Sequence, residues 1–157
     1  DTQDLVKIID SSKRRKNFRI NNSTKTFQAL RIFVNKEITE LILGIISATK
    51  KLKPGGKILV VSFHSIEDRI IKYFFNNYSK NKSRSSRYLP EDENNENALF
   101  EEYRNRIFKP SKQEIDKNKR SRSAKLRFAV RSSNEFYYPQ KLIDKFKNYL
   151  NLEGINV

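Results

Sequence analysis

The sequence contains no cysteine, so it can form no disulfide, no thiolate metal site and no cysteine nucleophile. A single histidine without cysteine also argues against a metal centre. The four glycines, Gly44, Gly55, Gly56 and Gly154, are spaced so that no Gly-x-Gly loop for a phosphate or nucleoside can be written. If the protein uses a nucleotide cofactor, we expect its binding loop to lie outside this chain.

Long apolar runs and methionine are missing as well. No stretch of about 18 apolar residues is present for a membrane span, and the N-terminus lacks the basic-then-apolar pattern of a signal peptide. We therefore expect a cytoplasmic location. Because the chain begins at Asp1 and contains no methionine, we expect it to be a piece of a longer protein.

Positive charge is present in excess. Lysine and arginine number 33 against 18 aspartates and glutamates, which gives a net charge of +15. This balance favours a polyanionic partner, with nucleic acid ahead of an anionic membrane surface. Basic residues are dense between Lys112 and Arg131, where they would neutralise phosphates without sequence preference. The 157 residues suffice for one core or part of one.

The apolar pattern predicts a helix, a strand and a second helix in the middle of the chain. Between Thr24 and Leu52, apolar residues recur every three or four positions, which predicts one long amphipathic helix. Lys57 to Val61 is short, apolar and β-branched, as in a central parallel strand covered on both faces. Helical spacing resumes from Ser65 to Asn76. Further expected elements are a helix within 1–12, strands at 103–109 and 122–130, a small helix starting at the Ser-x-x-Glu box of 111–114, a flexible loop over 79–100 and a helix over 136–151.

The only histidine, His64, lies at the tip between the predicted strand and the second helix. Loops at the carboxyl ends of strands hold the ligands in an open α/β sheet. His64 could orient a substrate or exchange protons there, or could simply hydrogen-bond to a backbone carbonyl. Ser65, with Asp68 three residues later, has the form of a helix N-cap, and the amides of a helix N-terminus would attract a phosphate.

Two predicted helices carry polar stripes beside their apolar ones. Arg31 belongs to the first stripe, and Arg69 and Lys72 belong to the second. On spacing alone, an ordinary solvated surface is the simpler interpretation of both.

Three blocks of sequence, taken together and in order, resemble one family. They are TFQALRIFVNKE at 26–37, PGG followed by SFHSIEDRIIK within 54–72, and RSAKLR at 122–127. This combination closely resembles the RsmH (MraW) family, S-adenosylmethionine-dependent methyltransferases that modify N4 of a cytidine in the decoding region of small-subunit (16S) ribosomal RNA. The resemblance covers about residues 1–131, and its departures at Asn22–Lys25 and at Lys119 would weaken loop rigidity more than chemistry.

The resemblance implies an α/β fold, the C-terminal half of a class I, Rossmann-like methyltransferase sheet, contributing its last three strands and their helices. Residues 1–22 would be the end of an inserted helical substrate domain, and residues 23–157 the C-terminal part of the methyltransferase domain. The cofactor would be S-adenosyl-L-methionine, with its main site in an N-terminal half outside this chain, which would leave the chain inactive alone. The partner would be small-subunit ribosomal RNA or the 30S subunit.

The resemblance also leads us to expect roles for particular residues. Ser62 and His64 would lie beside the target base and orient it, rather than act as a general base. Six cations would contact the RNA backbone, although some would pair with local acids such as Glu37 or Asp68: Arg31, Arg69, Lys72, Arg122, Lys125 and Arg127. The alternative is a basic RNA-binding or ribosome-associated module without activity, which would lack a strand and Gly-rich loop about a hundred or more residues upstream.

Overall fold

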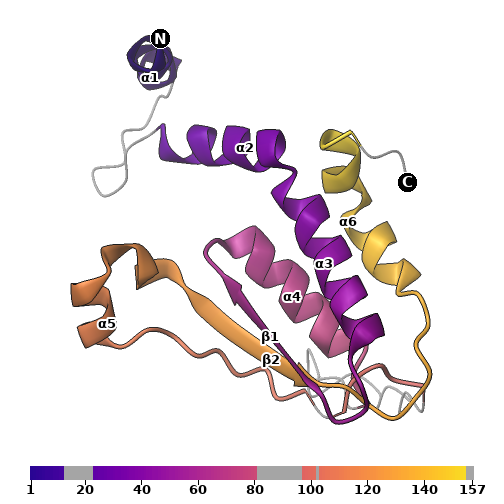
Figure 1. Cartoon of the computed structure of the whole chain (residues 1–157). Helices are drawn as coiled ribbons and strands as arrows, with labels where there is room; N and C mark the ends of the chain where they lie inside the picture. The colour runs from indigo at the N-terminus through magenta and orange to yellow at the C-terminus, as the bar shows by residue number, and fades with distance from the viewer. Residues whose placement is uncertain (13–22, 81–96, 102, 155–157) are drawn as a thin grey trace, which may run out of the picture. The chain divides into compact units, whose positions relative to one another are not determined.

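The computed structural model describes residues 1–12, 23–80, 97–101 and 103–154, and these form helices and a small two-stranded sheet (Figure 1). The chain divides into two compact units, residues 1–40 with 148–157 and residues 41–147. No helix within the described residues combines the length and the apolar character needed to cross a bilayer.

In chain order the elements are α1 (Thr2–Ser12), α2 (Thr24–Asn35), α3 (Glu37–Lys51), β1 (Lys57–Ser62), α4 (Ser65–Asn77), α5 (Lys112–Lys117), the 3₁₀ helix η1 (Lys119–Ser123), β2 (Lys125–Val130) and α6 (Gln140–Leu152).

The segment from Thr24 to Leu52 forms two helices, so the prediction of a single long helix is wrong. Lys36 adopts the left-handed conformation with φ of 51°, and its amide donates to the carbonyl oxygens of Ile32 and Phe33. This left-handed residue closes α2, and α3 begins at the next position. Because neither glycine nor proline marks the break, the regular apolar spacing hides it.

The N-terminus of α3 is capped by a residue distant in sequence. One carboxylate oxygen of Glu153 accepts from the amide of Ile38 at 3.2 Å, and the other accepts from the amide of Thr39 at 2.8 Å. A carboxylate here satisfies two amides that have no partner within the helix, and it interacts favourably with the helix dipole. All three residues are buried, so Glu153 fixes the C-terminal segment to the start of α3.

In the second unit, β1 and β2 pair in antiparallel orientation, with Lys57 opposite Val130 and Ser62 opposite Lys125. Helix α4 packs against this pair of strands (Figure 1). Along β1 the side chains alternate: Ser62 is 1% exposed, whereas Leu59 and Val61 are 60% and 53% exposed. Among the described residues, β1 is therefore not a parallel strand covered on both faces. The apolar side chains of Leu59 and Val61 lie on its exposed face.

The segment expected as a strand at 103–109 contributes only one isolated bridge. Phe108 pairs with Leu126 of β2 through two backbone hydrogen bonds of 3.0 and 2.9 Å. The Phe108 ring lies 6.0 Å from that of Phe128, which stands opposite Leu59 in the register. These side chains form a partly exposed apolar surface, called here the open sheet face: Leu59, Val61, Phe108 and Phe128.

The core of the second unit includes an aromatic cluster on α4. The Phe100 ring stands edge-on to Phe74 and to Phe75, with ring centroids 5.3 Å apart in both pairs. Most of the loop expected over 79–100 lies outside the described residues. Its ends do not fit that expectation, because Ser79, Leu99 and Phe100 are all fully buried. The apolar run at 98–100 anchors this part of the chain.

The remaining elements match their predictions with shifted boundaries. Ser111 caps α5 by accepting from the amide of Glu114 at 3.2 Å, as the Ser-x-x-Glu pattern predicts. Strand β2 begins at Lys125, later than predicted, because the preceding residues form η1. The helix expected over 136–151 is observed as α6, which starts immediately after Pro139.

Candidate functional site

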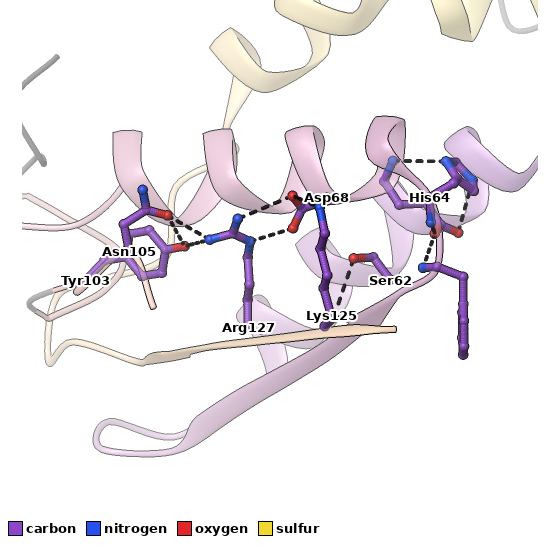
Figure 2. A network of polar contacts seen from close by, with 9 residues as sticks. Ser62, His64, Asp68, Tyr103, Asn105, Lys125 and Arg127 are labelled. Carbon is purple, nitrogen blue, oxygen red and sulfur yellow. Dashed lines mark hydrogen bonds and ion pairs between the residues drawn. The ribbon is translucent and has the colours of Figure 1, made fainter. Parts of the chain in front are cut away.

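The candidate site is the tip between β1 and α4, where the N-cap of α4 is His64 (Figure 2). The Nδ1 atom of His64 accepts from the amide of Glu67 at 3.4 Å, and the Glu67 carboxylate accepts from the amide of His64 at 3.2 Å. The same carboxylate oxygen accepts from the amide of Phe63 at 2.8 Å. Together these three hydrogen bonds hold the backbone at the end of the strand and the start of α4 in one arrangement.

The N-cap is therefore not Ser65, and its acidic partner is not Asp68. The prediction was one residue late, because an imidazole nitrogen can replace the serine oxygen as the acceptor at this position. An accepting Nδ1 carries no proton, so in this arrangement the ring hydrogen is on Nε2. The Nε2 atom lies 3.4 Å from a Glu67 oxygen. His64 therefore does bond to the backbone, but its ring accepts from an amide, whereas the expected partner was a carbonyl.

Ser62 lies at the last position of β1 and is buried. Its hydroxyl donates to the carbonyl oxygen of Lys125, across the sheet, at 3.4 Å. The structure therefore brings Ser62 and His64 to the same tip, with the serine hydroxyl turned toward β2.

A network of polar side chains joins α4 to β2 behind this tip (Figure 2). Asp68 accepts from Arg127 Nε at 2.7 Å, from Arg127 Nη2 at 3.3 Å and from Lys125 Nζ at 3.0 Å. Arg127 Nη1 donates to the Tyr103 hydroxyl at 2.8 Å and to the Asn105 side chain at 2.7 Å. The Arg127 side chain is only 2% exposed, so its charge is satisfied almost wholly within the protein.

The charges in this network shift one another's pKa values. Burial alone would raise the pKa of the Asp68 carboxyl, but the hydrogen bonds and charges of Arg127 and Lys125 outweigh burial and hold it below its usual value. Burial raises the pKa of the Tyr103 phenol, although the neighbouring Arg127 opposes the effect. Asp68 and Arg127 are therefore charged, and Tyr103 neutral, at physiological pH.

Three of the six cations pair with the two acids that were named as examples. Arg31 donates to both oxygens of Glu37, at 2.7 and 3.1 Å, and Asp68 holds Lys125 and Arg127. The structure leaves the other three proposed RNA-binding cations exposed on their elements: Arg69, Lys72 and Arg122.

Three residues of the site were missed at the level of sequence. Glu67 lies three residues after His64, which is the spacing of a capping box. Its role could have been predicted if histidine had been considered as an N-cap residue. Tyr103 and Asn105 had no such signal, because their contact with Arg127 depends on how β2 pairs with β1.

The network makes stability depend on pH through Asp68. Because the folded pKa is depressed, the stabilisation is present above the unfolded value of about 4 and is lost as pH falls through the folded pKa. We expect Asp68→Asn to cost about 1–3 kcal/mol near neutral pH and progressively less below pH 4. Urea unfolding of both proteins between pH 3 and 7 measures this difference. A gap that stays constant or widens toward pH 3 would contradict the assignment.

Comparisons with known proteins bear on this site. The model of the MraW methylase family matches residues 1–132. The chain is 44% identical over 154 residues to "Ribosomal RNA small subunit methyltransferase H" of Bartonella quintana, covering 98% of this chain and 46% of the relative. A protein of the same name from Agrobacterium fabrum is 43% identical over 133 residues, covering 84% of this chain and 38% of the relative. The chain thus spans less than half the length of these curated relatives.

Proposed function

The chain belongs to the MraW methylase family, and from this premise we propose that the protein containing it methylates small-subunit ribosomal RNA. The observation that carries the proposal is the similarity, over 98% of the chain, to a relative named as a methyltransferase of small-subunit ribosomal RNA. We propose the finer assignment implied by the sequence blocks: methyl transfer from S-adenosyl-L-methionine to N4 of a cytidine in the decoding region, with the 30S subunit or its RNA as the partner, in the cytoplasm.

The residues of this chain do not fit the main S-adenosylmethionine site. Gly44 lies inside α3, and Gly154 follows α6. Gly55 and Gly56 form the turn before β1, where a Cβ on Gly56 would meet the carbonyl oxygen of Lys53 at 2.9 Å. The Gly55 amide donates to the carbonyl oxygen of Arg131 and the Gly56 amide to that of Lys53, so neither amide is available to bind a ligand. We propose that the main cofactor site lies in a part of the protein outside this chain.

We further propose that β1 and β2 belong to a larger Rossmann-like sheet. The open sheet face supports this, because Leu59 and Val61 would be costly to leave in water in a complete enzyme. Among the described residues β1 pairs along one edge only, which leaves the other edge for a further strand. Residues 1–22 would then end an inserted helical domain, and residues 23–157 would complete the methyltransferase domain.

The tip would position the target base. The exocyclic amine of cytosine is a poor nucleophile because its lone pair is delocalised into the ring, so placing it in line with the methyl group supplies much of the rate. We propose that His64 orients the base and that Ser62, by its bond to β2, fixes the tip. A flipped base would reach this position from the RNA strand.

The exposed cations would hold the RNA backbone. We propose this role first for Arg69, Lys72 and Arg122, whose side chains are exposed. Arg31 and Lys125 are paired with Glu37 and Asp68, so each would divide its charge between that carboxylate and an RNA phosphate. Arg127 is enclosed by Asp68 and Tyr103, so it would act by holding α4 on β2.

The function is tested by comparing the whole protein with the 157-residue chain. The whole protein is expected to transfer labelled methyl groups from S-adenosylmethionine to unmodified 30S subunits, and mapping the product should place the label on N4 of one cytidine. Calorimetry of the chain alone should show no cofactor binding, since the glycine loop is missing.

Each outcome separates a different part of the proposal. Micromolar cofactor binding by the chain would overturn the location of the cofactor site. RNA binding by the whole protein without methyl transfer would instead favour the inactive RNA-binding module.

A further inference from the structure

The second unit contains a cavity of about 670 Å³, lined by the C-terminal part of α4, the start of α6 and the segment before it. Its size lies in the range of small-molecule sites. The segment 133–141, which supplies much of the lining, follows the residues matched by the family. The capping box and the Asp68 network take no part in it.

Aromatic rings form much of the wall. Tyr78 is 4% exposed and its ring lies 6.0 Å from that of Tyr137. Tyr137 and Tyr138 are themselves 38% and 53% exposed, so their rings are available at the rim. From α4, Tyr73 also lines the cavity, with its ring edge-on to Phe146 at 5.6 Å. A planar ligand can stack on the faces of such rings.

Polar side chains of one chemical type accompany the rings. Asn77, Asn134 and Gln140 line the cavity with carboxamide groups, each of which has both donors and acceptors. The amide nitrogen of Asn77 donates to the Tyr73 carbonyl at 2.9 Å, which fixes the orientation of that carboxamide. Burial raises the pKa of the Tyr78 phenol to about 12, so this group stays neutral.

The lining segment before α6 is held by buried and part-buried hydrogen bonds. Arg131 is 5% exposed and donates to the carbonyl oxygen of Leu99 at 2.9 Å and to that of Asn134 at 2.7 Å. Asn134 donates in turn to the carbonyl oxygen of Ala98 at 3.0 Å. These bonds tie the lining segment to the aromatic core, so the cavity is formed before any ligand arrives.

We propose that this cavity binds a nucleobase of single-stranded RNA, stacked on Tyr137 or Tyr138 and read by the carboxamides. The inference rests on the proposed function for the identity of the polymer, and it adds a second contact with RNA away from the tip. Proteins commonly bind unpaired bases by stacking them on aromatic side chains and hydrogen-bonding their edges.

Charge favours a base over the other ligands that such a cavity could take. Glu135 and Lys141 both line it, so the cavity carries one charge of each sign and has no excess of positive charge to hold a phosphate group inside. A cation would suit those rings, but the chain's charge of +15 opposes its approach. A base is neutral and its amino group can donate to Glu135, while Lys141 at the cavity can meet the attached phosphate.

The test compares two RNA octamers of equal phosphate number, oligocytidine and an abasic strand, by fluorescence anisotropy with the whole protein. Tyr138→Ala and Tyr137→Ala together should weaken oligocytidine binding about tenfold, because stacking is lost. Binding of the abasic strand should not change. Tyr138→Phe with Tyr137→Phe is the matched control, which keeps both rings and should bind oligocytidine as the unaltered protein does.

Equal losses for both octamers, or no loss for either, would overturn the inference. So would tight binding of a trimethyllysine peptide that depends on the same two tyrosines, since it would identify a site for cations. Methyl transfer to saturating 30S subunits is measured in parallel. If transfer persists while the octamers show no base-dependent site, the cavity proposal fails and the proposed function stands.

Discussion

Replacing Arg127 with alanine is expected to lower the free energy of unfolding by about 3–5 kcal/mol. The substitution removes the main partner of the Asp68 carboxylate and the donor to Tyr103 and Asn105. Because the Arg127 side chain is 2% exposed and that of Asp68 is 14% exposed, water can replace these bonds only in part. Urea unfolding of the chain, followed by circular dichroism, measures the change.

Two further variants test whether the loss of stability in Arg127→Ala comes from burying an unpaired charge. Lys125→Ala removes the other cation on Asp68, but Lys125 is 33% exposed, so about 1 kcal/mol or less is expected. The double variant Asp68→Leu with Arg127→Leu should recover much of the loss, because no buried charge is then left unpaired. If Arg127→Ala costs no more than Lys125→Ala, the guanidinium does not hold α4 on β2.

Local patterns were enough to predict the elements around the tip. The apolar run before Ser62 and the helical spacing after it each depend on neighbouring residues, and both appear as β1 and α4. The location of His64 between them follows from the same patterns. We also expected Asp68 to pair with some of the six cations, but the sequence did not indicate which of them.

Contacts between distant residues could not be predicted. Glu153 caps α3 from more than a hundred positions away, and no periodicity marks it as a cap. The burial of Arg127 follows from the register of β2 on β1, which places it opposite Val60 on the covered side. A one-residue slip would expose it. Sequence therefore indicated which residues were basic, but not which of them face solvent.

Replacing His64 with alanine is expected to lower turnover on 30S subunits about a hundredfold in the whole protein. Loss of the ring would let the target base shift from its reactive geometry. RNA affinity should fall by less than about threefold, because phosphate contacts made by other residues supply most of the binding energy. Single-turnover methyl transfer and filter binding with the same RNA measure the two quantities separately.

Asparagine at this position separates catalysis from capping. His64→Asn keeps a side-chain acceptor for the Glu67 amide, so it should restore the stability that His64→Ala loses, about 1 kcal/mol. It supplies no imidazole, so turnover should stay low if the ring orients the base. If His64→Asn restores turnover together with stability, the imidazole acts only through the capping box. Unchanged turnover in His64→Ala would remove it from the mechanism altogether, and the tip would then position the base through its backbone.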